Sequence, residues 1–179
     1  MKLETIEQAP LVDAGAFDLR ALRDSDAGLM TLYCADSRVA MNTTSIPHPL
    51  PPGASEAFIS RVVKTDEPED VWAMDASRQG GAEVMGLISL ERMEGNHSEI
   101  GYWVAPAFWN TGIASAAVEA ILKANPQNAS TIFASVFQDN PASARVLTNC
   151  GFQYLGDAES YSVARGAMVP TWTYSFHCG

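Results

Sequence analysis

Alternating apolar and polar residues divide the chain into short segments with the period of β-strands. The segments that alternate, or that form apolar runs between turns, are residues 17–22, 71–76, 84–90, 99–104, 131–137, 152–155 and 169–176. Glycine- and asparagine-rich turns separate the second, third and fourth of these, which predicts an antiparallel meander. In the fourth segment the alternation places Glu99 and Trp103 on one face of the strand and Tyr102 on the other.

Helical periodicity occurs between these segments. Apolar side chains recur at helical spacing in residues 24–35, 55–63, 112–124 and 141–149, and we expect a helix at each. Residues 46–53 (IPHPLPPG) contain four prolines, which remove backbone donors, so we predict a loop there and a pocket rim. Residues 1–15 have weak periodicity and are expected to form an arm or an irregular lead-in.

The order strand, helix, strand over residues 99–137 requires a crossover connection, so the two strands that it joins are expected to pair in parallel. A chain of 179 residues has the length of one domain, and we expect residues 1–179 to form it. The pattern predicts an α/β (α+β) fold with a mixed, mostly antiparallel central sheet of about six to seven strands flanked by about four helices.

Composition and charge narrow the class of protein. With 47% hydrophobic and 18% charged residues, the chain has the composition of an ordinary globular domain. The net charge of −10 repels nucleic-acid phosphates, and no stretch approaches the roughly 18 apolar residues of a membrane span. Three scattered cysteines suit neither a disulfide framework nor a metal site. We therefore expect a cytoplasmic protein with free thiols and no metal, which binds neither nucleic acid nor membrane.

Residues 102–124 have the pattern of an anion site. A strand end is followed by a loop that contains Gly112 and by a helix whose first turn is small and uncharged. Amide groups at a helix N-terminus point the same way and add to the helix dipole, so they can bind a pyrophosphate without a lysine. An ordinary turn has the same pattern, so spacing alone leaves both interpretations open.

Two motifs resemble the GCN5-related N-acetyltransferase (GNAT) superfamily. Residues 109–114 (WNTGIA) match its pyrophosphate loop, Arg/Gln-x-x-Gly-x-Gly/Ala, and residues 139–152 (DNPASARVLTNCGF) match its Asn-containing motif that ends in Gly-Phe. Gly112 and Asn140 are 28 residues apart, which suits one helix and one strand. With FDLRALRDSDA, IPHPLP and SEIGYWVAP, the resemblance covers nearly the whole chain. It is similar above all to the RimJ/RimL type of ribosomal-protein N-terminal acetyltransferase.

The resemblance implies a GNAT fold, with the sheet splayed between its fourth and fifth strands, and acetyl-CoA as co-substrate. Acetyl-CoA would enter between the strand ending at Val104 and the strand ending at Phe137. The residues implied to bind it are Trp103, Val104, Trp109, Asn110, Thr111, Gly112, Ile113, Ala114, Ser115 and Asn140. Backbone near Val104 and the side chain of Asn140 would hold the pantetheine, and the loop amides would hold the pyrophosphate. Trp109 replaces the usual basic or amide residue, so main-chain contact is expected there.

Direct attack of a neutral amine on the thioester is the reaction that the resemblance implies, with Glu99, Asn140 and Ser143 as candidate catalytic residues. Glu99 matches the glutamate of the EIGYW pattern and would remove a proton from the amine, directly or through a water. Leu147 occupies the position of a proton-donating tyrosine in many superfamily members. Ser143 or a water would therefore donate to the thiolate, and a backbone amide near Val104 would stabilise the oxyanion.

Structural roles compete with these assignments. Asn140 precedes a proline and is a good helix N-cap, Ser143 could satisfy an amide in the first helical turn, and Glu99 could be a structural carboxylate. His48 and His97 are alternative bases.

The acceptor expected first is a protein N-terminal amine. A small cationic amine, such as a polyamine or an aminoglycoside, is the alternative. The acidic residues Asp66, Glu67, Glu69 and Asp70 would favour a cationic acceptor, whether such an amine or a basic ribosomal-protein tail. A non-catalytic acyl-CoA-binding module and a structural domain without a cofactor are the competing classes. The oligomeric state is open between a monomer and a homodimer.

Overall fold

The computed structural model describes residues 9–64 and 66–179. Within these residues the strands are β1 (Val12–Asp13), β2 (Asp18–Ala21), β3 (Glu69–Asp75), β4 (Gly86–Met93), β5 (His97–Val104), β6 (Thr131–Phe137), β7 (Gln153–Ser162) and β8 (Ala167–His177). The α-helices are α1 (Ala27–Cys34), α2 (Ser37–Ala40), α3 (Ala54–Val62), α4 (Ile113–Ala124) and α5 (Pro141–Asn149). Short 3-10 helices are η1 (Asp24–Asp26), η2 (Ser77–Gln79) and η3 (Pro106–Phe108).

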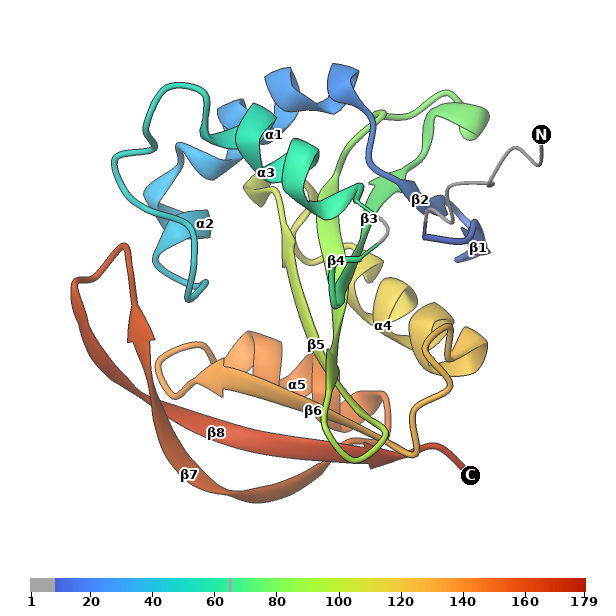
Figure 1. The fold of residues 1–179 in the computed structure, drawn as a ribbon, viewed down its shortest axis with the longest axis vertical. Coiled ribbons are helices and arrows are strands. Elements are labelled where there is room, and N and C mark those ends of the chain that lie inside the picture. Colours follow the sequence, from blue (N-terminus) through green and yellow to red (C-terminus); the bar gives the residue numbers. More distant parts are fainter. Residues whose placement is uncertain (1–8, 65) are drawn as a thin grey trace.

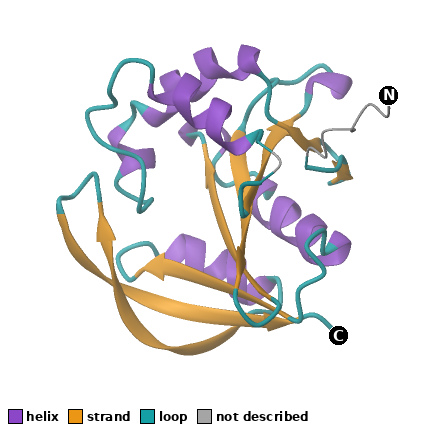
Figure 2. Ribbon diagram, viewed as in Figure 1, coloured by secondary structure: helices purple, strands orange, loops and turns teal. Residues whose placement is uncertain are grey.

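One mixed sheet contains these strands in the order β1-β2-β3-β4-β5-β6-β8-β7. Neighbouring strands are antiparallel except β5 and β6, which are parallel as the crossover through α4 predicts. The helices pack on both sides of the sheet (Figure 2), with α4 and α5 against one face and α1 and α3 against the other. Among residues 9–64 and 66–179, none of the helices has the length and hydrophobicity that a membrane crossing requires.

The sheet opens between β5 and β6. Residues 97–99 of β5 are in register with residues 131–133 of β6, and the pairing ends there. Both strands then continue without pairing, to Val104 and Phe137, and Figure 1 shows them diverging. The expected splay is therefore confirmed. It lies between the fifth and sixth strands of the structure because β1 adds one strand before the first predicted strand.

The predicted fold class, a mixed and mostly antiparallel sheet flanked by helices, is confirmed. The described residues form eight strands and five α-helices, one more of each than expected. The extra strand β1 lies in the predicted N-terminal arm, of which residues 1–8 fall outside the described residues. The extra helix α2 is four residues long and is capped by Asp36, which accepts a hydrogen bond from the amide of Arg38.

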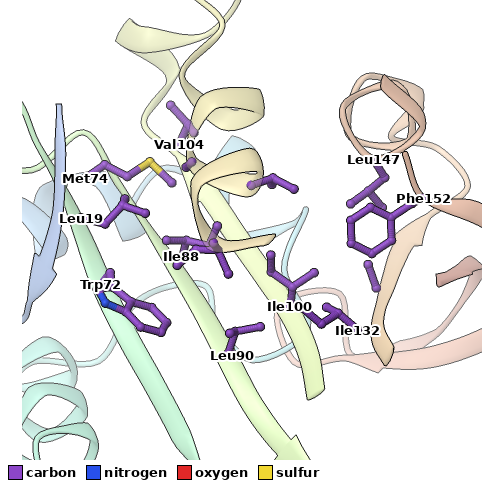
Figure 3. Packing of buried hydrophobic residues seen from close by; sticks show 14 of the residues in the cluster. Leu19, Trp72, Met74, Ile88, Leu90, Ile100, Val104, Ile132, Leu147 and Phe152 are labelled. Atoms are coloured by element: carbon purple, nitrogen blue, oxygen red, sulfur yellow. The ribbon is translucent and has the colours of Figure 1, made fainter. Parts of the chain in front are cut away.

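Buried apolar side chains fix β5 from both faces. The main cluster fills the space between the sheet and helices α4 and α5. Its labelled members in Figure 3 are Leu19, Trp72, Met74, Ile88, Leu90, Ile100, Val104, Ile132, Leu147 and Phe152. A second cluster, under α1 and α3, packs against Trp103. Because Ile100 and Trp103 face opposite clusters, the alternation predicted for this strand is confirmed.

Candidate active site

A cavity of about 500 Å³ lies where β5 and β6 separate, within the range of roughly 300–1,000 Å³ common for small-molecule sites. Its walls come from these two strands, from α3, from the start of α5 and from the β7–β8 hairpin. Pro47 and Leu50 of the proline-rich loop also line it, so the loop forms part of the pocket wall as predicted. Of the predicted site residues, Glu99, Trp103, Asn140 and Ser143 line this cavity together, although they come from distant parts of the sequence.

Glu99 lines the cavity from the face of β5 that carries Trp103, and its side chain is half-buried. Burial raises the pKa of Glu99, and the nearby carboxylate of Glu91 raises it further. Its ionised form is thus less stabilised than that of an exposed glutamate, which makes it a stronger base.

Three carboxylates form a row across neighbouring strands, which we call the carboxylate row: Glu69, Glu91 and Glu99. Glu91 is directly opposite Glu69 on one side and Glu99 on the other, and all three line the cavity. Directly opposed side chains lie roughly 5 Å apart at Cβ, so like charges there repel. Arg61 offsets part of this charge, since its Nη1 is 3.6 Å from Oε2 of Glu69. The row gives this wall of the cavity a negative potential.

The start of α5 brings two predicted residues, Asn140 and Ser143, to the cavity wall. The side-chain oxygen of Asn140 accepts a hydrogen bond from the amide of Ser143 at 3.4 Å, so Asn140 caps the helix. The hydroxyl of Ser143 is 2.8 Å from the hydroxyl of Tyr102 on β5. One turn after Ser143, the fully buried Leu147 also lines the cavity and offers no donor.

Tyr102 is a cavity residue that was not identified from the sequence. Burial raises its pKa to about 12, although the hydrogen bond with Ser143 acts in the opposite direction. Its place on the apolar face of β5 was recognisable from the alternation, but an aromatic at such a position is usually a core residue. Its partner Ser143 is 41 residues away in the sequence, so the contact had no local signal.

The loop of residues 109–115 lies at the end of β5, next to the cavity rather than in its wall. The indole N–H of Trp109 donates to the carbonyl of Val104 at 2.7 Å, which ties the loop to the strand end. Gly112 begins α4 with a φ of 80°, in the left-handed region that favours glycine, and the helix has no side-chain cap within the described residues. Its first-turn amides are therefore suited to an anion.

Positive charge lies next to this loop. The guanidinium of Arg38, at the start of α2, is 5.8 Å from the centroid of the Trp109 ring. It is also paired with Asp36 at 2.7 Å, and the Arg38 side chain is 63% exposed. The predicted pyrophosphate loop contains no basic side chain, but the side chain of Arg38 lies beside it.

The β7–β8 hairpin contributes Ser160 and Thr171 to the cavity wall, and its turn is tied to neighbouring segments. Arg165 in this turn donates to both carboxylate oxygens of Asp139, at 2.6 and 3.1 Å, and its Nε donates to the carbonyl of Met41 at 2.8 Å. The amide of Val163 donates to the carbonyl of Thr44 at 3.0 Å. These contacts hold the hairpin against the segment after α2 and against the residue that precedes Asn140, and no local sequence pattern predicts them.

The cysteines and His97 lie outside the cavity wall within the described residues, apart from Cys34, which lines it. The cysteines are free thiols as expected, and burial raises the pKa of Cys34 to about 12 and that of Cys150 to about 11, which keeps both protonated. His97 packs edge-on against Phe133 with ring centroids 5.2 Å apart. In the part of the chain that the structure describes, no three His, Cys, Asp or Glu side chains are grouped to hold a metal ion.

A family model described as an acetyltransferase (GNAT) domain matches residues 17–153. The chain belongs to the GNAT acetyltransferase family. This match confirms the resemblance inferred from the two sequence motifs. YoaA of Bacillus subtilis, an uncharacterised N-acetyltransferase, is 32% identical to this GNAT chain over 108 residues. The alignment spans 58% of this chain and 60% of YoaA, which is less than two thirds of that relative's length.

Solved GNAT structures share the fold over nearly the whole chain. RimL, a ribosomal alpha-N-protein acetyltransferase in complex with coenzyme A, has a TM-score of 0.78 at 15% identity and covers 94% of this chain and 98% of its own. Spermidine N-acetyltransferase from Vibrio cholerae, in complex with CoA and spermine, has a TM-score of 0.76 at 16% identity, covering 90% and 95%. At these identities the likeness establishes the fold.

Proposed function

We propose that this protein transfers the acetyl group of acetyl-CoA to a primary amine. The observation that carries the proposal is the cavity at the splay, in which the half-buried Glu99 and the polar start of α5, with Asn140 and Ser143, line different walls. A candidate base and a candidate donor therefore line the same cavity. The family match and the CoA complexes of RimL and the spermidine enzyme support the same reaction.

The chain offers groups that fit acetyl-CoA. Where β5 and β6 diverge, the backbone groups of residues 100–104 on the side facing β6 have no strand partner within the described residues. Apart from the Val104 carbonyl, which accepts from the Trp109 indole, these groups can pair with the amides of pantetheine. The uncapped first turn of α4, from Ile113 to Ser115, suits the pyrophosphate, and the Arg38 guanidinium, which is paired with Asp36, lies beside Trp109. Asn140 would contact the pantetheine arm from the other side.

Acetyl-CoA supplies an activated thioester carbonyl. The residues of the chain would remove a proton from the amine, stabilise the oxyanion and donate to the sulfur. Glu99 takes a proton from the acceptor ammonium, directly or through a water, so that the neutral amine can attack. A backbone amide near Val104 donates to the carbonyl oxygen as it becomes an oxyanion. Ser143 donates a hydrogen bond to the sulfur as the carbon–sulfur bond breaks, a role that Leu147 cannot fill because its side chain has no donor.

The acceptor that we propose first is a protein N-terminal amine, as the RimJ/RimL-type motifs and the RimL structure suggest. A small cationic amine is the second candidate, and a specific observation favours it. The carboxylate row lines the cavity with negative charge that a polyamine would complement, and the Vibrio cholerae enzyme of the same fold was solved with spermine.

Release of free CoA thiol from acetyl-CoA, measured across peptides with varied N-terminal residues and across small cationic amines, tests the proposal. Turnover on peptides supports the first acceptor, and turnover on polyamines supports the second. Glu99→Gln and Ser143→Ala should lower either turnover. Binding of acetyl-CoA without turnover on any amine would instead favour a non-catalytic acyl-CoA-binding module.

A further inference from the structure

Tyr102 and Ser143 join the two sides of the splay through a hydroxyl pair. Tyr102 comes from β5 and Ser143 from the first turn of α5, and their hydroxyl oxygens are 2.8 Å apart. The Tyr102 oxygen is also 3.2 Å from the main-chain carbonyl oxygen of Ser143. Both residues line the cavity. The pair therefore bridges the gap beside the space where the thioester would lie.

The longer contact fixes Tyr102 as a donor, and the shorter contact allows it to donate to the Ser143 hydroxyl as well. A carbonyl oxygen can only accept, so the contact with the Ser143 carbonyl requires Tyr102 to be the donor. Its single proton can be shared between both oxygens of Ser143, although in the shorter contact either hydroxyl can be the donor. When Tyr102 donates in both contacts, the Ser143 hydroxyl has no other hydrogen-bond partner among the described residues, and its own proton can point into the cavity.

The surroundings of Tyr102 keep its hydroxyl protonated, so that it can act as a donor. Tyr102 is half-buried, its burial raises its pKa, and the nearby Cys150 raises the pKa further. Tyr102 therefore remains protonated at neutral pH. A hydroxyl that accepts a hydrogen bond also becomes a better donor, because neighbouring bonds polarise one another.

We infer that Tyr102 is a positioning residue for the acetyl transfer: it donates to Ser143 and so directs the Ser143 proton toward the sulfur of CoA. The inference rests on the proposed function. As the carbon–sulfur bond breaks, its electron pair moves to the sulfur, which accepts a hydrogen bond from Ser143. No proton leaves Tyr102 or Ser143 in this step. CoA departs as a thiolate that water protonates, and Glu99 keeps the proton taken from the amine.

The thiol pKa of bound CoA tests the proposed hydrogen bond from Ser143 in the absence of an amine substrate. It is measured from the ultraviolet absorbance of the thiolate across a pH series, in complexes with wild type, Tyr102→Phe, Ser143→Ala and the double variant. We expect wild type to hold the thiol pKa below that of free CoA. Each single variant should raise it, with roughly tenfold less thiolate for each unit of pKa. The double variant should raise it no further than Ser143→Ala.

Turnover gives the second readout. Ser143→Ala should lower kcat about 100-fold, as the loss of one donor to a developing charge does, and Tyr102→Phe about 10-fold, with the Kd for acetyl-CoA unchanged. Tyr174→Phe is the matched control, because Tyr174 is a buried tyrosine of β8 outside the cavity wall, and it should match wild type. A purely structural Tyr102 would change stability and leave the thiol pKa and kcat unchanged.

Fluorotyrosine at position 102 keeps the test decisive if Tyr102→Phe does not fold, because it preserves the ring and strengthens the donor. It should lower the thiol pKa of bound CoA. A thiol pKa that is unchanged in Tyr102→Phe or in the fluorotyrosine protein, or additive effects in the double variant, would overturn the inference. Failure of wild type to bind CoA would instead refute the proposed function, and the inference with it.

Discussion

Glu99 on β5 lies directly opposite Glu91 on β4 in the antiparallel pair that these strands form. Burial raises the pKa of Glu99, and the charge of Glu91 adds to the effect. Opposed like charges destabilise a sheet, so this arrangement opposes folding while it makes Glu99 a stronger base. The pair connects the register of the sheet to the acid–base chemistry that we propose.

The pH dependence of turnover should report this pair. Because its pKa is raised, Glu99 becomes protonated, and inactive as a base, at a higher pH than an ordinary glutamate as the pH falls. The acidic limb of kcat/KM should therefore lie above the usual glutamate range. Glu91→Gln should move that limb to lower pH, because it removes the neighbouring charge and leaves the burial. Glu99→Gln should lower kcat/KM by about 10²- to 10⁴-fold. An acidic limb that Glu91→Gln leaves in place would rule out this coupling.

Asn140 has two proposed roles that substitution can separate. Asn140→Ala removes the cap on the amide of Ser143 and should cost about 1 kcal/mol of unfolding free energy. Asn140→Asp keeps a capping oxygen, so its stability in denaturant should match wild type, but it loses the amide donor. Titration calorimetry should then show weaker acetyl-CoA binding by Asn140→Asp. Wild-type affinity in that variant would leave Asn140 with the capping role alone.

Arg20 holds two buried carboxylates beneath the first helices. It donates to both oxygens of Asp26, at 2.8 and 2.9 Å, and to Asp75, and the side chain of Asp26 is fully buried. Arg20→Met leaves both carboxylates without their main partner and should cost about 3–5 kcal/mol in a urea titration. Arg92→Met is the matched control, since Arg92 is 53% exposed and 3.4 Å from its partner Asp70, and it should cost less than about 1 kcal/mol. An equal loss of unfolding free energy in the two variants would contradict a stabilising role for the buried Arg20 network.

Acid should weaken this network. Burial raises the pKa of Asp75, but hydrogen bonds from Ser77 and Arg20 outweigh it, and the net pKa is lowered. The stability that Asp75 contributes is therefore present above the pKa of an unfolded aspartate and is lost as the pH falls through its lowered value. Arg20→Met should lose less stability on acidification than wild type, as measured by urea titrations over a pH series.

Gly86 permits the close approach of β4 to the end of β5. A Cβ at this position would lie 2.2 Å from the carbonyl oxygen of Trp103, a backbone atom that cannot move away cheaply. Gly86→Ala should therefore cost about 3 kcal/mol or more. Gly28→Ala in α1 is the control, because its Cβ would meet nothing within 4 Å, and it should stabilise the protein by about 0.5–1 kcal/mol. Thermal unfolding of the two variants should shift in opposite directions.

Local signals explain which elements could be predicted from the sequence. The boundaries predicted for β6 and α5 are those of the structure, since an apolar run and an Asn-Pro cap mark them. β7 runs over Gln153–Ser162, far beyond the predicted residues 152–155, because it is a mostly exposed edge strand held by backbone pairing to β8 rather than by burial.

The site was predictable only in part, for a related reason. Glu99, Asn140 and Ser143 stand in motifs, and the fold brings them to one cavity. Tyr102 and Arg165 act through contacts with residues far along the chain, which no local pattern encodes.

Acetylation of an amine by the purified protein is the most direct test of the central claim. Wild type and Glu99→Gln are incubated with acetyl-CoA and the acceptor panel, and the products are identified by mass spectrometry. We predict an N-acetylated amine formed in step with CoA thiol by wild type, and formation slower by about 100-fold or more in Glu99→Gln. Binding of acetyl-CoA with no acetylated amine from any peptide or small amine, or equal rates in the two proteins, would contradict the account.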